Sequence, residues 1–195
     1  DNDQYYWRIT QFMLPSHSIT PSSMPGETYY GYTWVPIDDV SCWIYVYAWH
    51  PGQPIPADER AKYVKGGYGQ FAELGPNDIP VRNKGNDYLI DREDQKLNSF
   101  TGVRGIAEQD QLAWESQGPL MDRRHEKLSP TDVGIVRFRL AMLEGVRALQ
   151  AGTPPQAAAN PHTYCLRAGG AVESVQLSFE AVMQKRFGSL SGSVK

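Results

Sequence analysis

The stretch "TYYGYTWVPIDDVSCWIYVYAWH", residues 28 to 50, carries the clearest indication of the fold. Its two runs, 28–37 and 42–50, are rich in aromatic and β-branched residues, and the short segment "DDVS" separates them. Runs of this kind joined by a few turn residues are typical of an antiparallel hairpin. The second run alternates Trp43, Tyr45, Tyr47 and Trp49 on one face with Cys42, Ile44, Val46 and Ala48 on the other. Since both sets are largely apolar, we expect both faces to be covered.

An upstream run, "YYWRITQFML" at 5–14, has the same character and predicts a third strand. Most of the five tryptophans and eleven tyrosines lie in the first fifty residues, which indicates a sheet with an aromatic face. That face could be packed core, or it could line a ligand cavity.

The strand pattern ends at "HPGQPIPADER", which contains three prolines. The connection over 51–86 is far longer than the few residues usual between elements, and connections of that length tend to be functional or to wrap around a neighbour. Residues 87–105 show neither helical nor strand periodicity, so we expect an ordered loop there.

Two helices are expected next. The first covers 106–117 and stops at Gly118–Pro119. The second begins at "SPTD", 129–132, with an N-cap serine, a proline at the first helical position and an acid three residues on. Apolar residues at helical spacing predict that this helix faces a core: Val133, Val136, Leu140, Leu143 and Val146. Residues 174–189 could form a weak terminal helix or a frayed tail.

The order of strands, long loop and helices predicts an α+β fold, an antiparallel sheet covered on one side by a long C-terminal helix. We expect 1–150 to form one unit and 151–195 to be a C-terminal extension or tail.

Composition narrows the class of protein. A chain of 195 residues with 41% hydrophobic and 21% charged residues has ordinary globular composition. No apolar run reaches the roughly 18 residues of a membrane helix, and no targeting segment is visible, so we expect a soluble cytoplasmic protein. A net charge of −3 without a basic stripe argues against nucleic-acid binding. Two cysteines without a Cys/His cluster imply neither a disulfide scaffold nor a zinc site.

Three acids stand close together in "GIAEQDQLAWESQG", residues 105 to 118. Side chains three and four positions apart share one side of a helix, and on this count Asp110 has apolar neighbours, whereas Glu108 and Glu115 have polar ones. Asp110 is therefore expected to project from the buried stripe, where a carboxylate must be paired, protonated or bound to a metal. The alternative is an ordinary acid in the first helical turn, where the helix dipole favours negative charge.

The segments "NDYLIDRE-Q" and "SFTGVRGI-EQD", within 86–110, resemble the C-terminal catalytic region of Rieske-type aromatic-ring oxygenases of the phthalate dioxygenase and aryl O-demethylase branch. The earlier segments "RITQFMLPSHS" and "WVPIDD" are similar to strands of the same family, so the resemblance covers roughly 5–150. It implies a helix-grip fold, incomplete in this chain, and hydroxylation or O-demethylation of an aromatic substrate by dioxygen. It also implies a reductase that supplies electrons from NAD(P)H, and a homotrimer or hexamer in which 51–86 contacts another subunit.

In that family two histidines and one carboxylate hold a mononuclear Fe(II). The carboxylate stands in an acid-x-Asp pattern followed four residues later by an aromatic, which falls on Glu108, Asp110 and Trp114, so the resemblance makes Asp110 the iron ligand. The C-x-H and C-x-x-H ligands of the [2Fe–2S] Rieske cluster and the histidine pair of the iron site are not in this sequence. We expect them upstream, in a larger protein of which this is a C-terminal portion.

Strand position predicts that Arg8, Gln11, Tyr32 and Trp49 face the substrate cavity. An arginine there would suit a carboxylated arene through bidentate pairing, although Arg8 could equally pair on the surface. The competing interpretation of the whole chain is an iron-free ligand-binding module of the same helix-grip architecture.

Overall fold

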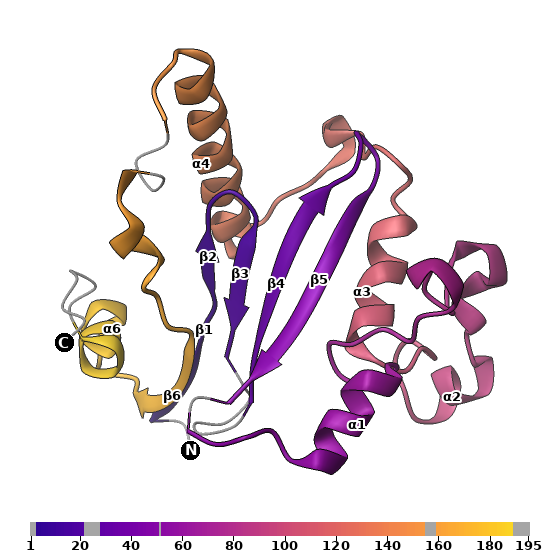
Figure 1. Cartoon of the computed structure of the whole chain (residues 1–195). Helices are drawn as coiled ribbons and strands as arrows, with labels where there is room; N and C mark the ends of the chain where they lie inside the picture. Colours follow the sequence, from indigo (N-terminus) through magenta and orange to yellow (C-terminus); the bar gives the residue numbers. More distant parts are fainter. Residues whose placement is uncertain (1–2, 22–27, 51, 155–158, 189–195) are drawn as a thin grey trace.

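The computed structural model describes residues 3–21, 28–50, 52–154 and 159–188. Its largest element is an antiparallel four-stranded sheet of order β2-β3-β4-β5 (Figure 1). The strands are β2 (Gln11–Met13), β3 (His17–Thr20), β4 (Tyr29–Pro36) and β5 (Cys42–Trp49). The predicted hairpin is present as β4 and β5, which pair from Tyr29 opposite Trp49 to Pro36 opposite Cys42.

A second, two-stranded sheet joins the start of the chain to its C-terminal part. β1 (Gln4–Ile9) pairs antiparallel with β6 (Gly169–Ser174), and α6 (Phe179–Phe187) packs against them. The buried Glu173 of β6 accepts hydrogen bonds from Lys185 and Arg186 of α6, at 2.7 and 2.9 Å. β6 and α6 are therefore tied to the first strand, while the division of the chain at residue 150 stays a prediction.

The helices lie around the large sheet (Figure 1). They are α1 (Ala57–Lys65), α2 (Arg92–Leu97), α3 (Ile106–Glu115) and α4 (Val133–Gln150). Short 3-10 turns occupy Pro76–Asp78, Lys84–Leu89, Arg123–His125, Pro130–Asp132 and Pro161–Tyr164. None of the helices in the described ranges combines the length and hydropathy needed to cross a bilayer.

The predicted α+β class with antiparallel strands is confirmed, and the strands do not close into a barrel. Several local elements differ from the sequence predictions. The single strand expected at 5–14 is divided into β1 and β2, which belong to different sheets. α1 and α2 form where only connections were expected, and β3 and β6 were missed. β3 begins at His17, and its residues pair with β4 across the sheet.

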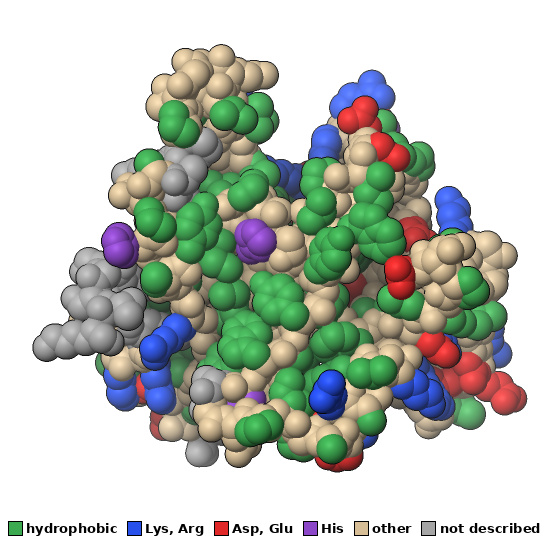
Figure 2. Space-filling model, in the orientation of Figure 1, with side chains coloured by type: hydrophobic (Ala, Val, Ile, Leu, Met, Phe, Trp, Pro, Cys, Tyr) green, Lys and Arg blue, Asp and Glu red, His purple; other side chains and the backbone are tan. Residues whose placement is uncertain are grey.

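The prediction that both faces of the sheet are covered is wrong for the described residues. On β5 the aromatic side chains Trp43, Tyr45 and Tyr47 are exposed. The ring of Tyr47 lies over Gly31 of β4, and a Cβ added to Gly31 would stand 2.2 Å from that ring. On the face seen in Figure 2, hydrophobic side chains gather over the central region where the strands of Figure 1 lie. A large part of the apolar surface is thus open to solvent.

The prediction of a core-facing second helix also needs correction. α4 forms as expected, but none of its described residues is buried, and the stripe from Val133 to Val146 is exposed. The helix meets the sheet through Phe138, whose ring packs edge-on against Phe12 of β2 at 4.6 Å. In Figure 1 the rest of α4 extends past the end of the sheet, so its apolar stripe has little to pack against.

Candidate functional site

A row of three aromatic side chains on β4 lies beneath the helices. Tyr30, Tyr32 and Trp34 occupy alternate positions and therefore share one face of the sheet. The Tyr30 hydroxyl is 2.8 Å from that of Tyr63 in α1, and Trp34 meets Trp114 of α3 edge-on at 5.3 Å. Phe12 is opposite Ser18, which in turn is opposite Tyr32, so its contact with α4 is on this same face. The helices α1, α3 and α4 all meet this face of the sheet.

Asp110 is one helical turn before Trp114 and is directed to the same row. Its negative charge contributes to the raised pKa of Tyr32, for which burial of the phenol is the larger cause. Arg8 acts in the opposite direction and lowers the pKa of Tyr32, so it also lies within electrostatic reach. Asp110 and Arg8 thus both lie within electrostatic reach of Tyr32, and Tyr32 remains a neutral phenol, able to donate a hydrogen bond.

The structure assigns burial among the acids differently from the sequence prediction. Asp110 and its neighbours Ile106 and Trp114 are exposed, whereas Glu108 is 1% exposed. The reason is that the opposite side of α3 packs on the 66–73 loop, where Glu108 accepts a hydrogen bond from the backbone of Glu73 at 3.1 Å. The prediction that Asp110 projects from the buried stripe is therefore wrong for the described residues.

The Asp110 carboxylate has no bonding partner in the part of the chain that the structure describes, so it could bind a cation. It forms no hydrogen bond or ion pair with another described residue. Partial burial of the carboxyl group raises the pKa of Asp110, although the residue as a whole is exposed. Desolvation without a partner is unfavourable for a charged carboxylate, and a cation would relieve it.

The other two predicted pocket residues lie on the opposite face. Trp49 is opposite Tyr29 and stacks on it at 5.7 Å, so it points away from the Tyr32 side. Gln11 is in register with Ile19 and, through it, with Gly31, which also belongs to that far face. The structure brings together Arg8, Tyr32 and Asp110, and it leaves Gln11 and Trp49 apart from them. Arg8 forms no ion pair with another described residue.

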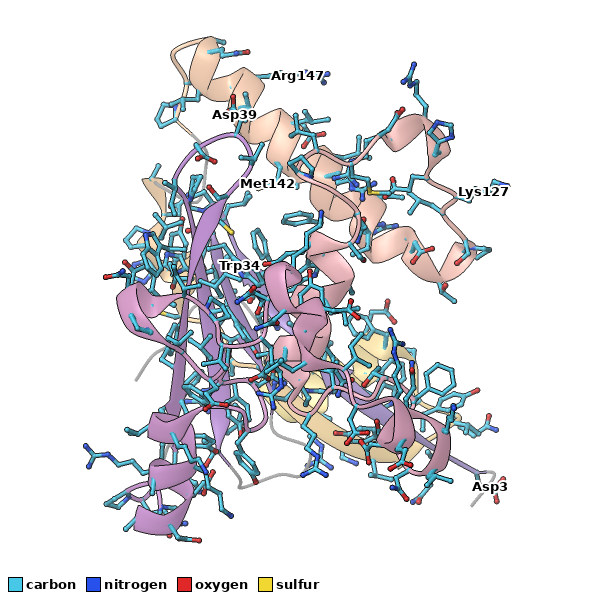
Figure 3. All side chains as sticks on the ribbon, turned by 90° about the vertical axis from the view of Figure 1, so that its right-hand side faces the viewer. Asp3, Trp34, Asp39, Lys127, Met142 and Arg147 are labelled. Atoms are coloured by element: carbon cyan, nitrogen blue, oxygen red, sulfur yellow. The ribbon has the colours of Figure 1, made fainter. Side chains whose placement is uncertain are left out.

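An apolar cavity of about 530 Å³ opens beside the site, between the end of the sheet and α4. It is lined by Phe12, Pro15, Ser16, Trp34, Val35, Pro36, Cys42, Phe138 and Met142. Figure 3 shows two of these, Met142 and Trp34, on the helix and the sheet. Trp34 borders the cavity and also contacts Trp114 beside Asp110, so the two features adjoin. The helical periodicity of 133–146 indicated a packed face but not this cavity.

The residues present fit one ligand of the expected iron site. Asp110 supplies a carboxylate without a partner, but the described residues contain no group of three His, Cys, Asp or Glu side chains that could hold a metal. Two of the histidines are engaged elsewhere: His17 contacts the Thr33 hydroxyl at 2.8 Å, and His50 accepts from backbone amides at 3.1 and 3.2 Å. Two imidazole ligands would have to come from outside the described residues.

A sheet with helices packed on one of its faces is consistent with a helix-grip domain. The chain belongs to the LigXa C-terminal domain-like family, whose model matches residues 1–187. The resemblance to the phthalate dioxygenase branch of Rieske-type oxygenases is thereby confirmed.

Two relatives are oxygenase subunits of aromatic dioxygenases. The phthalate 4,5-dioxygenase oxygenase subunit of Pseudomonas putida is 37% identical over 150 residues, covering 75% of this chain and 33% of that subunit. The 3-chlorobenzoate-3,4-dioxygenase oxygenase subunit of Comamonas testosteroni is 30% identical over 210 residues, covering 97% of this chain and 47% of that subunit. The chain thus spans between a third and a half of the length of these relatives.

Proposed function

We propose that this chain forms the C-terminal part of the catalytic domain of a Rieske non-heme iron oxygenase that oxidises an aromatic carboxylate. The observation that carries the proposal is the Asp110 carboxylate. It is directed at the Tyr32 face, lies partly desolvated and has no partner among the described residues. In this proposal Asp110 is one of three protein ligands of a mononuclear Fe(II), and a [2Fe–2S] cluster elsewhere in the subunit passes on electrons from a reductase that uses NAD(P)H.

The bound iron would supply the activation of dioxygen, and the residues of this chain would position the substrate. Both relatives are named for aromatic acids, which favours a carboxylated arene. Arg8 offers such a substrate a guanidinium group that no described carboxylate neutralises. The neutral Tyr32 phenol can donate a hydrogen bond to a substrate oxygen, and the apolar cavity beside Trp34 offers space for the ring.

The reaction proposed first is ring hydroxylation, because both relatives are named dioxygenases. O-demethylation of a methoxyarene is the alternative within the same chemistry. A cytoplasmic homotrimer or hexamer is also proposed, in which the segment around α1 contacts a neighbouring subunit.

The test is mononuclear iron content and product formation in the complete oxygenase subunit carrying Asp110→Ala or Asp110→Asn. Alanine removes a ligand, and asparagine removes the charge that offsets Fe(II), so both variants should lose iron and turnover while the Rieske spectrum persists. Glu144→Gln is the matched control, since Glu144 is an exposed acid on α4 with no partner among the described residues. An iron-loaded, active Asp110→Ala enzyme would refute the assignment.

An iron-free ligand-binding module is the second candidate, favoured by the apolar cavity between the sheet and α4. It predicts that the wild-type subunit binds an aromatic acid with the same affinity whether or not iron is present. Calorimetric titration of iron-loaded and iron-depleted protein separates the two functions.

A further inference from the structure

The acids on either side of Asp110 hold the helix that carries it. Glu108 and Glu115 are seven residues apart and therefore lie within about 20° of each other around the helix axis, while Asp110 is about 200° from Glu108. One face of α3 thus carries both glutamates, and the opposite face carries Asp110 and Trp114 toward the sheet.

The N-terminal end of α3 is held to the 66–73 loop by hydrogen bonds that α3 donates and by one that it accepts. The amides of Ile106 and Ala107, which have no partner within the helix, donate to the Gly69 carbonyl at 2.8 and 3.2 Å. In return, Glu108 Oε1 accepts from the Glu73 amide. Glu108 Oε2 is buried without a described partner and lies so close to Gly105 that an added Cβ would stand 2.0 Å away.

The C-terminal end of α3 is held by a buried tyrosine. The Tyr88 hydroxyl donates to Glu115 Oε2 at 2.7 Å, and Gln111 donates to Glu115 Oε1 at 2.9 Å. Tyr88 is the middle of three consecutive residues with positive φ, between Asp87 and Leu89. Such a conformation is strained for non-glycine residues and persists only where the surroundings impose it.

We infer that Glu108, Glu115 and Tyr88 are positioning residues that fix the rotation of α3 and so aim Asp110 at the Tyr32 face. This inference rests on the proposed function. A rotation of α3 by about 20° would move its outer side-chain atoms by about 2 Å, given a helix radius of 5–6 Å with side chains. Metal–ligand distances hold within about 0.2 Å, so a rotation of that size would displace the Asp110 carboxylate far beyond that range.

The experiment measures Co(II) binding to the metal-depleted, complete oxygenase subunit, through its dissociation constant and its visible spectrum. Glu115→Ala and Tyr88→Phe should weaken Co(II) binding by on the order of 10- to 100-fold and alter the spectrum. Glu115→Gln retains an acceptor for the Tyr88 hydroxyl and should restore most of the affinity. Glu108→Ala should also weaken Co(II) binding. If Glu108→Ala fails to fold, Tyr88→Phe still tests the inference, because it removes only a single hydroxyl.

Two controls separate the possible failures. Glu144→Ala should bind Co(II) as the wild type does. Asp110→Ala should abolish binding; if it does not, the proposed metal role of Asp110 is wrong, and the inference falls with it. If Asp110→Ala abolishes binding but Glu115→Ala and Tyr88→Phe keep the wild-type affinity and spectrum, the positioning role alone is overturned.

Discussion

Replacing Gly105 by alanine tests the packing of α3 most directly. Gly105 is the N-cap of α3 with a φ of +88°, and an added Cβ would stand 2.0 Å from Glu108 Oε2. The backbone strain amounts to about 1–2 kcal/mol. Displacing the buried Glu108 carboxylate also leaves the Glu73 amide without its acceptor, which costs about 1–3 kcal/mol more. We therefore expect Gly105→Ala to lower the free energy of unfolding by roughly 2–5 kcal/mol.

Gly118→Ala is the matched control. Gly118 has a φ of +86°, but no atom lies within 4 Å of an added Cβ, so only the backbone strain applies. The assay is urea unfolding of the complete subunit followed by circular dichroism. The double variant Gly105→Ala with Glu108→Ala should lose less than the sum of the single variants, because the clash is gone. Equal losses for Gly105→Ala and Gly118→Ala would refute the packing described for Glu108.

Three further outcomes are expected. Lys185 and then Arg186 lower the pKa of Glu173, so the stability that the Glu173 carboxylate contributes is present above the ordinary glutamate pKa and is lost as the pH falls through the lowered value. Glu173→Gln should therefore reduce the urea midpoint at pH 7 and make that midpoint less dependent on acid pH. Burial of the phenol, and secondly its hydrogen bond to Glu115, raise the pKa of Tyr88 to about 12. The neutral Tyr88 phenol therefore stabilises the fold below the ordinary tyrosine pKa of about 10, and this contribution disappears toward pH 12. In an alkaline titration followed by absorbance, Tyr88→Phe should lack one late-titrating tyrosine. Arg8→Gln should raise KM for a carboxylated arene about tenfold or more, with little effect on an uncharged ring, in steady-state assays.

Local patterns in the sequence determined the elements whose chemistry is contained in neighbouring residues. Alternating aromatic and aliphatic side chains predicted β5 and its pairing with β4, because a strand of period two needs no information from elsewhere. The serine and proline at 129–130 predicted a helical start, and Ser129 caps the 3-10 turn Pro130–Asp132 that leads directly into α4, since a cap is a contact within one turn. The family pattern around Asp110 was likewise readable in a few consecutive residues.

Long-range contacts decided the rest. β6 forms because residues 169–174 find the open edge of β1, more than 150 positions away, and nothing in their own composition required it. α4 carries the apolar stripe of a core helix, yet its side chains stay exposed because the sheet reaches only Phe138 and its surroundings.

The sequence pattern also did not predict which acidic residue of α3 is buried. Counting neighbours along one helix selected Asp110, but the burial of Glu108 depends on a glycine-rich loop about forty residues earlier. That loop presents the Gly69 carbonyl and the Glu73 amide to the start of the helix. A helical pattern shows which side chains share a face of the helix. Which segment covers that face depends on tertiary contacts, because backbone groups far away in the sequence need hydrogen-bond partners when they are buried.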